Sequence, residues 1–391
     1  MALIYTEADS LLRESASGFL KEKSPLSALR QLRDTRDDTG FSKSLWQEIS
    51  DMGWAGIVIP EQYGGLEYGY KGLGVLFEEM GRTLTASPLL STVAVAASTL
   101  LHGGTKTQKK ELLPVIASGD VIVAFALEEQ RHHAPEAMVL RADRTSGGYI
   151  LNGKKRYVID GHVADKLIVV ARTLPVTTGG HPSTLEGISL FLLDKNSEGI
   201  SVERTIMVDS RNAANLGFDN VVILESALIG KLHQGGDILE AVLNIAQVCL
   251  SAELLGICQR TFEMTLNYLK ERQQFGQLIG SFQSLQHRAA LMYCEIELCK
   301  SVVLKALLAI DDHKGNSHKK DNALSKLASL TKAKLCETTK LITNEAIQLH
   351  GGIGMTDEFD LGFYIKRARA VQQTFGGYEY HLDRYARLSG F

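Results

Sequence analysis

The sequence predicts an α+β, mostly α-helical protein: an N-terminal helical domain (residues 1–120), a central β-barrel or sandwich domain (121–228) and a C-terminal four-helix bundle (229–391). Three observations predict this order. The chain has 391 residues, more than one ordinary core organises. All seven prolines lie at or before Pro182, so the remainder can form long helices. Between the helical ends, short apolar runs alternate with glycine-rich turns.

The first domain is predicted from apolar residues at helical spacing. The expected helices are Glu7–Leu20, Phe41–Met52, Tyr70–Thr83, Leu89–Leu101 and Gln108–Ala117. A Gly/Pro-rich connection follows the second of them, at residues 54–65.

The second domain is predicted from short apolar or alternating runs. The expected strands are Val121–Leu127, Met138–Ala142, Tyr149–Asn152, Leu167–Ala171, Ile188–Leu193 and Phe218–Leu224. Turn clusters at 145–148 and 177–180 separate some of them. Several short strands at this spacing are typical of a small barrel or sandwich.

Three long helices are predicted in the third domain. The first starts near Asp237 as N-cap and runs toward Glu271. The second starts near Ser281, and its apolar residues step by three or four. This core-facing stripe comprises Leu285, Ala289, Met292, Ile296, Cys299, Val303, Leu307 and Ile310. After a polar loop at 311–320, the third runs from about Asp321 to Leu349, and shorter helices end the chain. An antiparallel four-helix bundle is therefore expected.

Composition excludes several classes of protein. The net charge of −3 gives no reason to expect a nucleic acid or an anionic membrane as partner. No apolar run approaches the ~20 residues of a membrane span, and the N-terminus has no secretory pattern. The five cysteines are spaced like small buried residues of a reducing cytoplasm rather than metal ligands, so no metal site is expected.

Two long motifs identify a relationship. One is Arg-Gln-Gln-Phe-Gly-Gln-Leu-Ile at 272–279, followed by Phe282-Gln283; the other is Glu-Ala-Ile-Gln-Leu-His-Gly-Gly-Ile-Gly-Met at 345–355. Weaker matches occur at 124–127 and 151–155. Over essentially its whole length the chain resembles the acyl-CoA dehydrogenase family. Its C-terminal stretch resembles small subunits of heteromeric, pimeloyl-CoA-type members.

The resemblance implies FAD as cofactor and an acyl-CoA thioester as substrate. A pyrophosphate is bound well by a guanidinium such as Arg272 and by backbone N–H groups at Gly351 and Gly352. The expected FAD contacts are Arg272, Phe275, Gln283, Gln348, Gly351 and Gly352, with Phe125, Leu127 and Tyr157 at the flavin ring. In the family the first six largely reach the FAD of a neighbouring subunit, which implies an oligomer. Taken singly, Arg272 and the glycines are equally well explained as a helix end.

The catalytic base of the family is missing. Removal of the proton beside the thioester needs a base, normally a glutamate. Counting from Gly351-Gly352, its position falls on Phe375, or on Gly376 with a one-residue slip. The position used by a minority of the family falls on Ala246, followed by Gln247. No catalytic residue is therefore assigned.

The flavin-ring contacts are altered as well. Glu128 replaces a threonine that faces the flavin in the family, and Ile159 has no hydroxyl for flavin N5. His132-His133 is expected to lie in an exposed loop rather than to bind a metal ion.

Three hypotheses follow. The first is a subunit of a FAD-dependent acyl-CoA dehydrogenase, in a dimer or tetramer with a sibling that supplies the glutamate; an electron-transfer flavoprotein is the expected electron acceptor. The second is a self-sufficient oxidoreductase with a relocated base at Glu128, Glu253 or Glu379. The third is a non-catalytic acyl-CoA-binding scaffold.

Overall fold

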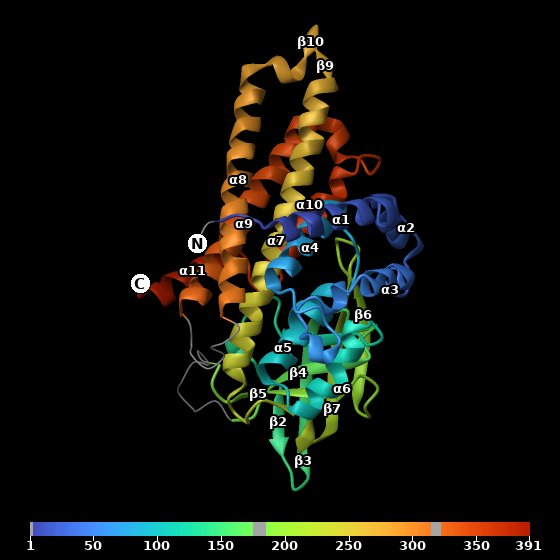
Figure 1. Cartoon of the computed structure of the whole chain (residues 1–391), viewed down its shortest axis with the longest axis vertical. Helices are drawn as coiled ribbons and strands as arrows, with labels where there is room; N and C mark the ends of the chain where they lie inside the picture. The colour runs from blue at the N-terminus through green and yellow to red at the C-terminus, as the bar shows by residue number, and fades with distance from the viewer. Residues whose placement is uncertain (1–2, 175–184, 314–321) are drawn as a thin grey trace.

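The computed structural model describes residues 3–174, 185–313 and 322–391. Figure 1 shows an elongated molecule with the strands at its lower end and the α7–α8 connection, with β9 and β10, at the opposite tip. The predicted turn at 177–180 and most of the predicted polar loop at 311–320 lie outside the described residues. The predicted fold class is confirmed.

The first region is helical. Its elements are α1 (Glu7–Lys23), α2 (Leu26–Thr35), α3 (Lys43–Asp51), α4 (Tyr70–Thr83), the π-helical η3 (Leu89–Ala97), α5 (Ser98–Gly103) and α6 (Lys106–Ala117). Thr6 with Asp9 and Thr105 with Gln108 form capping boxes at the starts of α1 and α6. The sequence prediction missed α2, which begins after Pro25 and buries only Leu29.

The strands form one eight-stranded sheet. They are β1 (Val123–Ala126), β2 (Arg141–Arg144), β3 (Gly148–Ile159), β4 (Lys166–Arg172), β5 (Ile188–Asp194), β6 (Ile200–Ile206), β7 (Asn212–Leu224) and β8 (Leu228–Ile229). Their order is β6-β7-β3-β2-β4-β5-β8, and β1 pairs with β4. Long β3 and β7 pair antiparallel, with register shifts after Leu151 and Lys155. The prediction missed the largely exposed edge strand β6, whose pattern has no buried face.

The last region is a helical bundle. It consists of α7 (Gly235–Glu271), α8 (Gln283–Asp312), α9 (Asn322–His350), α10 (Leu361–Gln373) and α11 (Tyr378–Ser389); short β9 (Gln273–Gln274) and β10 (Gln277–Leu278) join α7 to α8. The predicted stripe of α8 is buried from Met292 to Ile310, whereas Leu285 and Ala289 are half-buried. Asp237 lies inside the first turn of α7 and is not its N-cap, which is Gln234.

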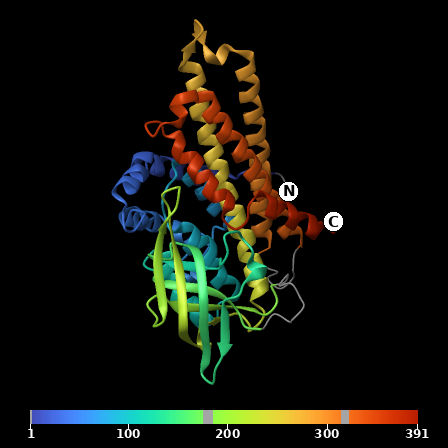
Figure 2. The same cartoon turned by 180° about the vertical axis from the view of Figure 1, so that it is seen from behind.

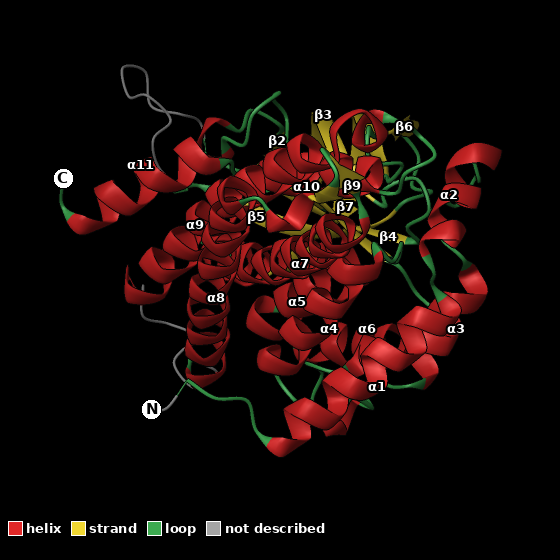
Figure 3. Ribbon diagram, turned by 90° about the horizontal axis from the view of Figure 1, so that it is seen from above, coloured by secondary structure: helices red, strands yellow, loops and turns green. Residues whose placement is uncertain are grey.

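Helix α7 is the axis of the molecule. It packs against α8, α9 and α10 on one side and α4 and α5 on the other (Figure 3). It is the one described helix long and apolar enough to cross a membrane, and 94% of that apolar window is buried inside the fold, as a core helix requires. Four cysteines are buried as expected, but Cys294 on α8 is exposed.

The sheet and the bundle meet beside α10. Seen from behind, the helices of the bundle lie above the strand region (Figure 2), and Phe375, in the turn after α10, lines a small hollow together with Phe125 and Tyr157 of the sheet. One hydrophobic core runs through the N-terminal helices and the bundle, and a second lies within the sheet. Helix α6 ends at Ala117 and β1 starts at Val123; the predicted domain boundaries at 120 and 228 stay predictions.

Candidate active site

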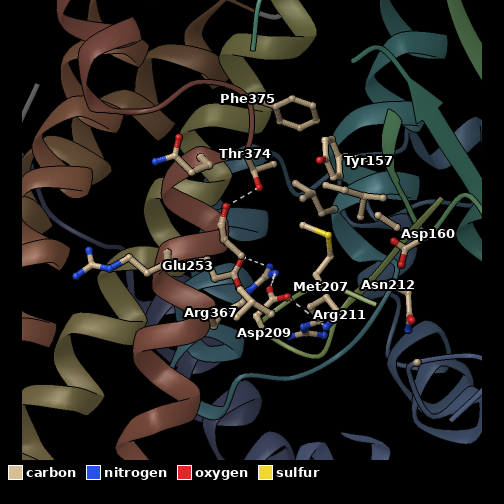
Figure 4. A pocket seen from close by; sticks show the side chains of 18 of the residues that line it. Tyr157, Asp160, Met207, Asp209, Arg211, Asn212, Glu253, Arg367, Thr374 and Phe375 are labelled. Atoms are coloured by element: carbon tan, nitrogen blue, oxygen red, sulfur yellow. Dashed lines mark hydrogen bonds and ion pairs between the residues drawn. The ribbon is translucent and has the colours of Figure 1, made fainter. Parts of the chain in front are cut away.

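A cavity of about 400 Å³ lies where the three regions meet. Its wall comes from α4, η3, the loop after β1, the C-terminal end of β3, the β6–β7 turn, α7, and the segment from α10 to Phe375. Figure 4 shows the side chains of Phe375 and Tyr157 at one side, and those of Asp209, Arg211 and Arg367 at the other, with Met207 between them. The cavity therefore has an aromatic side and an ionic side.

The aromatic side contains the positions predicted for a flavin ring. Tyr157 is 40% exposed, at positive φ, and lines the cavity together with Phe375. Phe125 and Leu127 line a small adjoining hollow with both of them. The structure thus brings Phe125, Leu127 and Tyr157 together. Ile159 lies beside them, and its aliphatic side chain has no hydroxyl to offer to flavin N5.

The turn that carries Phe375 is held by two buried side chains, Lys332 and His381. Lys332 Nζ donates to the carbonyl oxygens of Gln372, Thr374 and Gly376, at 3.0–3.2 Å. His381 Nε2 lies 3.1 Å from the Phe375 carbonyl oxygen. Burial lowers the pKa of the Lys332 ammonium and lowers that of His381 to about 2, so His381 is neutral and donates through Nε2.

Gln247, the neighbour of the α7 position at which a minority of the family places its base, contacts this turn. Gln247 Nε2 donates to the Phe375 carbonyl oxygen, and Ala246 beside it is fully buried. The Phe375 side chain lines the cavity, but it cannot accept a proton. A Cβ on Gly376 would lie 2.4 Å from Tyr380 Cδ1, so that position has no room for a side chain.

The ionic side is a buried triple of charges. Arg367 of α10 binds both oxygens of Glu253 of α7, at 2.6 and 3.0 Å, and Oδ2 of Asp209, at 2.8 Å. Burial opposes the charge of Arg367, but these carboxylates outweigh it and raise its pKa. Glu253 is committed to this ion pair, which ties the bundle to the β6–β7 turn. It is not a free base.

Asp160 is a buried acid that sequence reasoning did not single out. It follows β3, is 9% exposed and lines the cavity. Ser91 Oγ of η3 donates to its Oδ2 at 2.6 Å. Burial raises the pKa of Asp160 to about 6, partly offset by that bond and by Arg211 and Arg367. Only the fold, which brings η3 against β3, reveals it.

Glu128 pairs with His133 across the loop after β1. The distance from Glu128 Oε1 to His133 Nδ1 is 2.5 Å. The His133 side chain is 2% exposed and packs edge-on against Tyr380 at 4.7 Å. The expectation of an exposed histidine pair is therefore wrong for His133, because the C-terminal turn covers it; His132 is exposed. Glu379 is exposed on α11 and does not line the cavity.

The remaining predicted cofactor residues lie at the far tip. They are Arg272, Phe275, Gln283, Gln348, Gly351 and Gly352, all exposed. Stacking of Tyr268 on His350, at 4.5 Å, brings the two motifs to one end of the bundle. Nineteen residues of α7 separate Arg272 from Glu253, or about 28 Å at 1.5 Å per residue. One chain therefore keeps Arg272 far from Glu253 and the cavity, and the other five residues lie at the same end of the bundle as Arg272.

The tip is open and suited to contact from outside. Phe275 is 91% exposed. A Cβ on Gly351 or Gly352 would meet nothing within 4 Å, so their backbone is accessible. Arg272 is also the C-cap residue of α7, so it ends the helix and keeps its guanidinium exposed.

Comparison with known proteins decides the ancestry. Three family models match in order: the acyl-CoA dehydrogenase N-terminal domain at residues 6–120, the middle domain at 124–221 and the C-terminal domain at 233–389. An acyl-CoA dehydrogenase of Bacillus subtilis is 30% identical over 94% of both chains. This chain belongs to the acyl-CoA dehydrogenase family.

Two solved structures of the family's fold are similar over nearly the whole chain. The FAD complex of PigA is 27% identical, with a TM-score of 0.87, and covers 100% of this chain and 99% of its own. The Tcur3481-Tcur3483 steroid ACAD is 29% identical, with a TM-score of 0.85 and 98% coverage of both.

As a member of this family, the chain is a FAD-dependent oxidoreductase that acts on CH–CH groups. The cavity and its adjoining hollow fit the aromatic faces of a flavin ring, because Tyr157, Phe125, Leu127 and Phe375 supply aromatic and aliphatic surface. It offers no hydroxyl at Ile159, and Glu128 is already paired with His133.

Proposed function

We propose that this chain is one subunit of a FAD-dependent acyl-CoA dehydrogenase, that it lacks its own catalytic base, and that it completes the site of a sibling subunit. The reaction removes one proton from the α-carbon and one hydride from the β-carbon of an acyl-CoA thioester. FAD, when bound, accepts the hydride. The proton needs a base in the cavity, and this chain's residues decide whether one exists.

The observation that carries the proposal is that each of the four carboxylates lining the cavity already has a hydrogen-bond or ion-pair partner. Asp209 and Glu253 are both held by Arg367. Asp160 accepts a hydrogen bond from Ser91. Glu128 is paired with His133. At the family's own positions stand Phe375, Gly376, Ala246 and Gln247, none of which is a base.

The exposed tip supports the proposal that this chain completes the site of a sibling subunit. Arg272 lies about 28 Å along α7 from Glu253 at the cavity, and the other five predicted FAD contacts lie at the same end of the bundle, so we infer that they do not serve the ring site of the same chain. We propose that they hold the adenosine end of the FAD of the sibling. The resulting dimer or tetramer would pass electrons to an electron-transfer flavoprotein in the cytoplasm.

The proposal is tested by expressing the chain alone and together with a sibling that carries the glutamate. We expect co-purification in a fixed ratio, with acyl-CoA dehydrogenase activity and full flavin content only in the complex. Stoichiometric flavin and high activity in the isolated chain would contradict it. Tight acyl-CoA binding without flavin, alone and in the complex, would favour the non-catalytic scaffold.

Self-sufficient catalysis remains the second candidate, and Glu128 is the residue that favours it. Among the three relocated bases proposed from the sequence, Glu128 alone lines the cavity without being held by an arginine. Replacement of Glu128 by Gln would then slow flavin reduction by acyl-CoA about 100-fold or more. Unchanged reduction in this variant excludes Glu128 as the base.

A further inference from the structure

Arg211 is a cation on the cavity wall with unused hydrogen-bond donors. It ends the β6–β7 turn, where Met207 N–H donates to its carbonyl oxygen at 2.8 Å. Its Nη2 donates to the carbonyl oxygens of Leu84 and Thr85, at 2.9 and 2.6 Å. Within the described parts of the chain, Nε and Nη1 have no acceptor, and Nε is fully buried. Since the side chain lines the cavity, Nη1 is the donor available to a ligand.

The nearby carboxylates do not neutralise Arg211 at short range. Asp209 and Glu253 both bind Arg367, and the described residues give Arg211 no ion pair within 4 Å. Burial lowers the pKa of Arg211 to about 10, with a further lowering from Arg367, so it remains a cation at neutral pH. A partly buried cation with spare N–H groups is stabilised by any oxygen acceptor that enters the cavity.

Two other polar side chains that line the cavity, Asn212 and Arg369, are already engaged. Asn212 Oδ1 accepts from Arg204 Nε at 2.9 Å. Arg369, on the aromatic side of the turn, gives its terminal nitrogens to Gln372 and Asn344. Arg131 is exposed on the loop after β1. Arg211 is therefore the cavity cation best placed to select a ligand.

The position of Arg211 in the cavity indicates which end of the acyl group it contacts. Figure 4 shows Arg211 on the side of the cavity away from Phe375 and Tyr157, with Met207 between. For an acyl-CoA bound in this cavity, the thioester end belongs at the aromatic side, beside the residues predicted to contact the flavin ring. The far end of the acyl group then points toward Arg211.

We propose that the acyl group carries, at its distal end, an oxygen that accepts a hydrogen bond from Arg211. This deepens the proposed function and rests on it for the acyl-CoA. A carboxylate and a ketone share this chemistry, whereas a plain alkyl end would leave the guanidinium without an acceptor. The cavity is thus built for an oxygenated acyl chain.

The test compares binding of three thioesters of matched chain length to the purified protein, in the complex if a sibling is required. The first ends in a methyl group, the second in a ketone and the third in a carboxylate; a ladder of lengths is used for each. We expect the best oxygenated ligand to bind about tenfold or more tightly than its alkyl match, measured by calorimetry. Comparison of the ketone-ended and carboxylate-ended thioesters shows which of the two groups supplies the oxygen that Arg211 binds.

Two variants and one control locate the effect. Arg211→Met should abolish the preference, and Arg211→Lys should retain part of it because the charge survives. Arg141→Met is the matched control, since Arg141 is exposed on β2, pairs with Asp143 and lies outside the cavity. Folding of each variant is checked by circular dichroism; if Arg211→Met fails to fold, the wild-type panel and Arg211→Lys decide.

Each outcome has one meaning. Equal binding of alkyl and oxygenated chains, or a preference that survives in Arg211→Met, overturns the inference about Arg211 but leaves the proposed function intact. Failure of every thioester to bind overturns both. Full activity of the isolated protein would overturn the proposal that two subunits share one site. The preference for an oxygenated acyl group could still be measured in that case.

Discussion

Gln247 Nε2 donates a hydrogen bond to the carbonyl oxygen of Phe375, with a distance of 3.1 Å between the two atoms. Gln247 is the neighbour of the α7 position used by a minority of the family, and Phe375 occupies the commoner position by motif count. The two positions are therefore contiguous in space. Phe375 lines the cavity and Ala246 is buried nearby on α7, and neither residue can act as a base.

Restoring a carboxylate at Phe375 should restore proton removal. Phe375 lines the cavity at positive φ, whereas Gly376 has no room for a side chain. For the flavin-loaded Phe375→Glu variant, we expect acyl-CoA to reduce the flavin about 100-fold or more faster than in wild type. Stopped-flow absorbance measures this rate. Phe375→Gln is the matched control; an equal gain in both variants, or none in either, would mean that this position does not place the base.

Loss of Arg367 should unfold the junction of the three regions. Arg367→Met leaves Asp209 and Glu253 buried without a partner and should lower the free energy of unfolding by about 3–5 kcal/mol. Glu253→Gln should also lower stability, because one charge of the triple is lost. Both are measured by denaturant unfolding. Since Glu253 is structural, its Gln variant should keep the wild-type rate of flavin reduction; a loss of 100-fold in that rate with normal stability would instead make Glu253 the base.

Asp160→Asn should stabilise the protein at neutral pH. The folded-state pKa of Asp160 is about 6, above its usual 3.8, so its favourable contribution is complete below pH 3.8 and is lost as the pH rises through 6. Asn mimics the protonated acid and can still accept from Ser91. We expect a gain of roughly 1–3 kcal/mol at pH 7 that vanishes below about pH 4. Thermal unfolding across this range measures it; a pH-independent difference would refute the assigned cause.

Arg272→Ala should weaken flavin retention without affecting the fold. The Arg272 side chain is exposed at the tip, and its backbone alone caps α7. In a complex with the sibling, we expect about tenfold weaker FAD binding, from the loss of charged hydrogen bonds to the pyrophosphate. Fluorescence titration with FAD measures this. Lys270→Ala, in the last turn of α7, is the matched control; similar losses in both would show that the effect is general charge at the tip.

Much of the fold could be predicted from local patterns in the sequence. The bounds of Tyr70–Thr83 were predicted from apolar spacing alone, and α8 buries the predicted stripe from Met292 onward. Edge strand β6 and helix α2 escaped prediction because neither has a clear buried face. An amphipathic pattern reports burial, so elements with little burial leave little trace in the sequence.

The candidate site could be predicted only in part. The motifs located Tyr157, Arg272 and the gap at Phe375, because their residues are contiguous in the sequence. The ion pair of Glu253 with Arg367 joins residues 114 apart, and the contact of Ser91 with Asp160 joins residues 69 apart. No local spacing encodes such pairs, and Arg211 gains its meaning only from the cavity around it.

The most direct test of the central claim is anaerobic flavin reduction by the isolated, FAD-reconstituted wild-type chain with saturating acyl-CoA. The chain has no free base in its cavity, so the account predicts reduction at least ~100-fold slower than in the complex with its sibling. If the isolated chain reduces its flavin as fast as the complex does, it possesses a base of its own and the account is wrong.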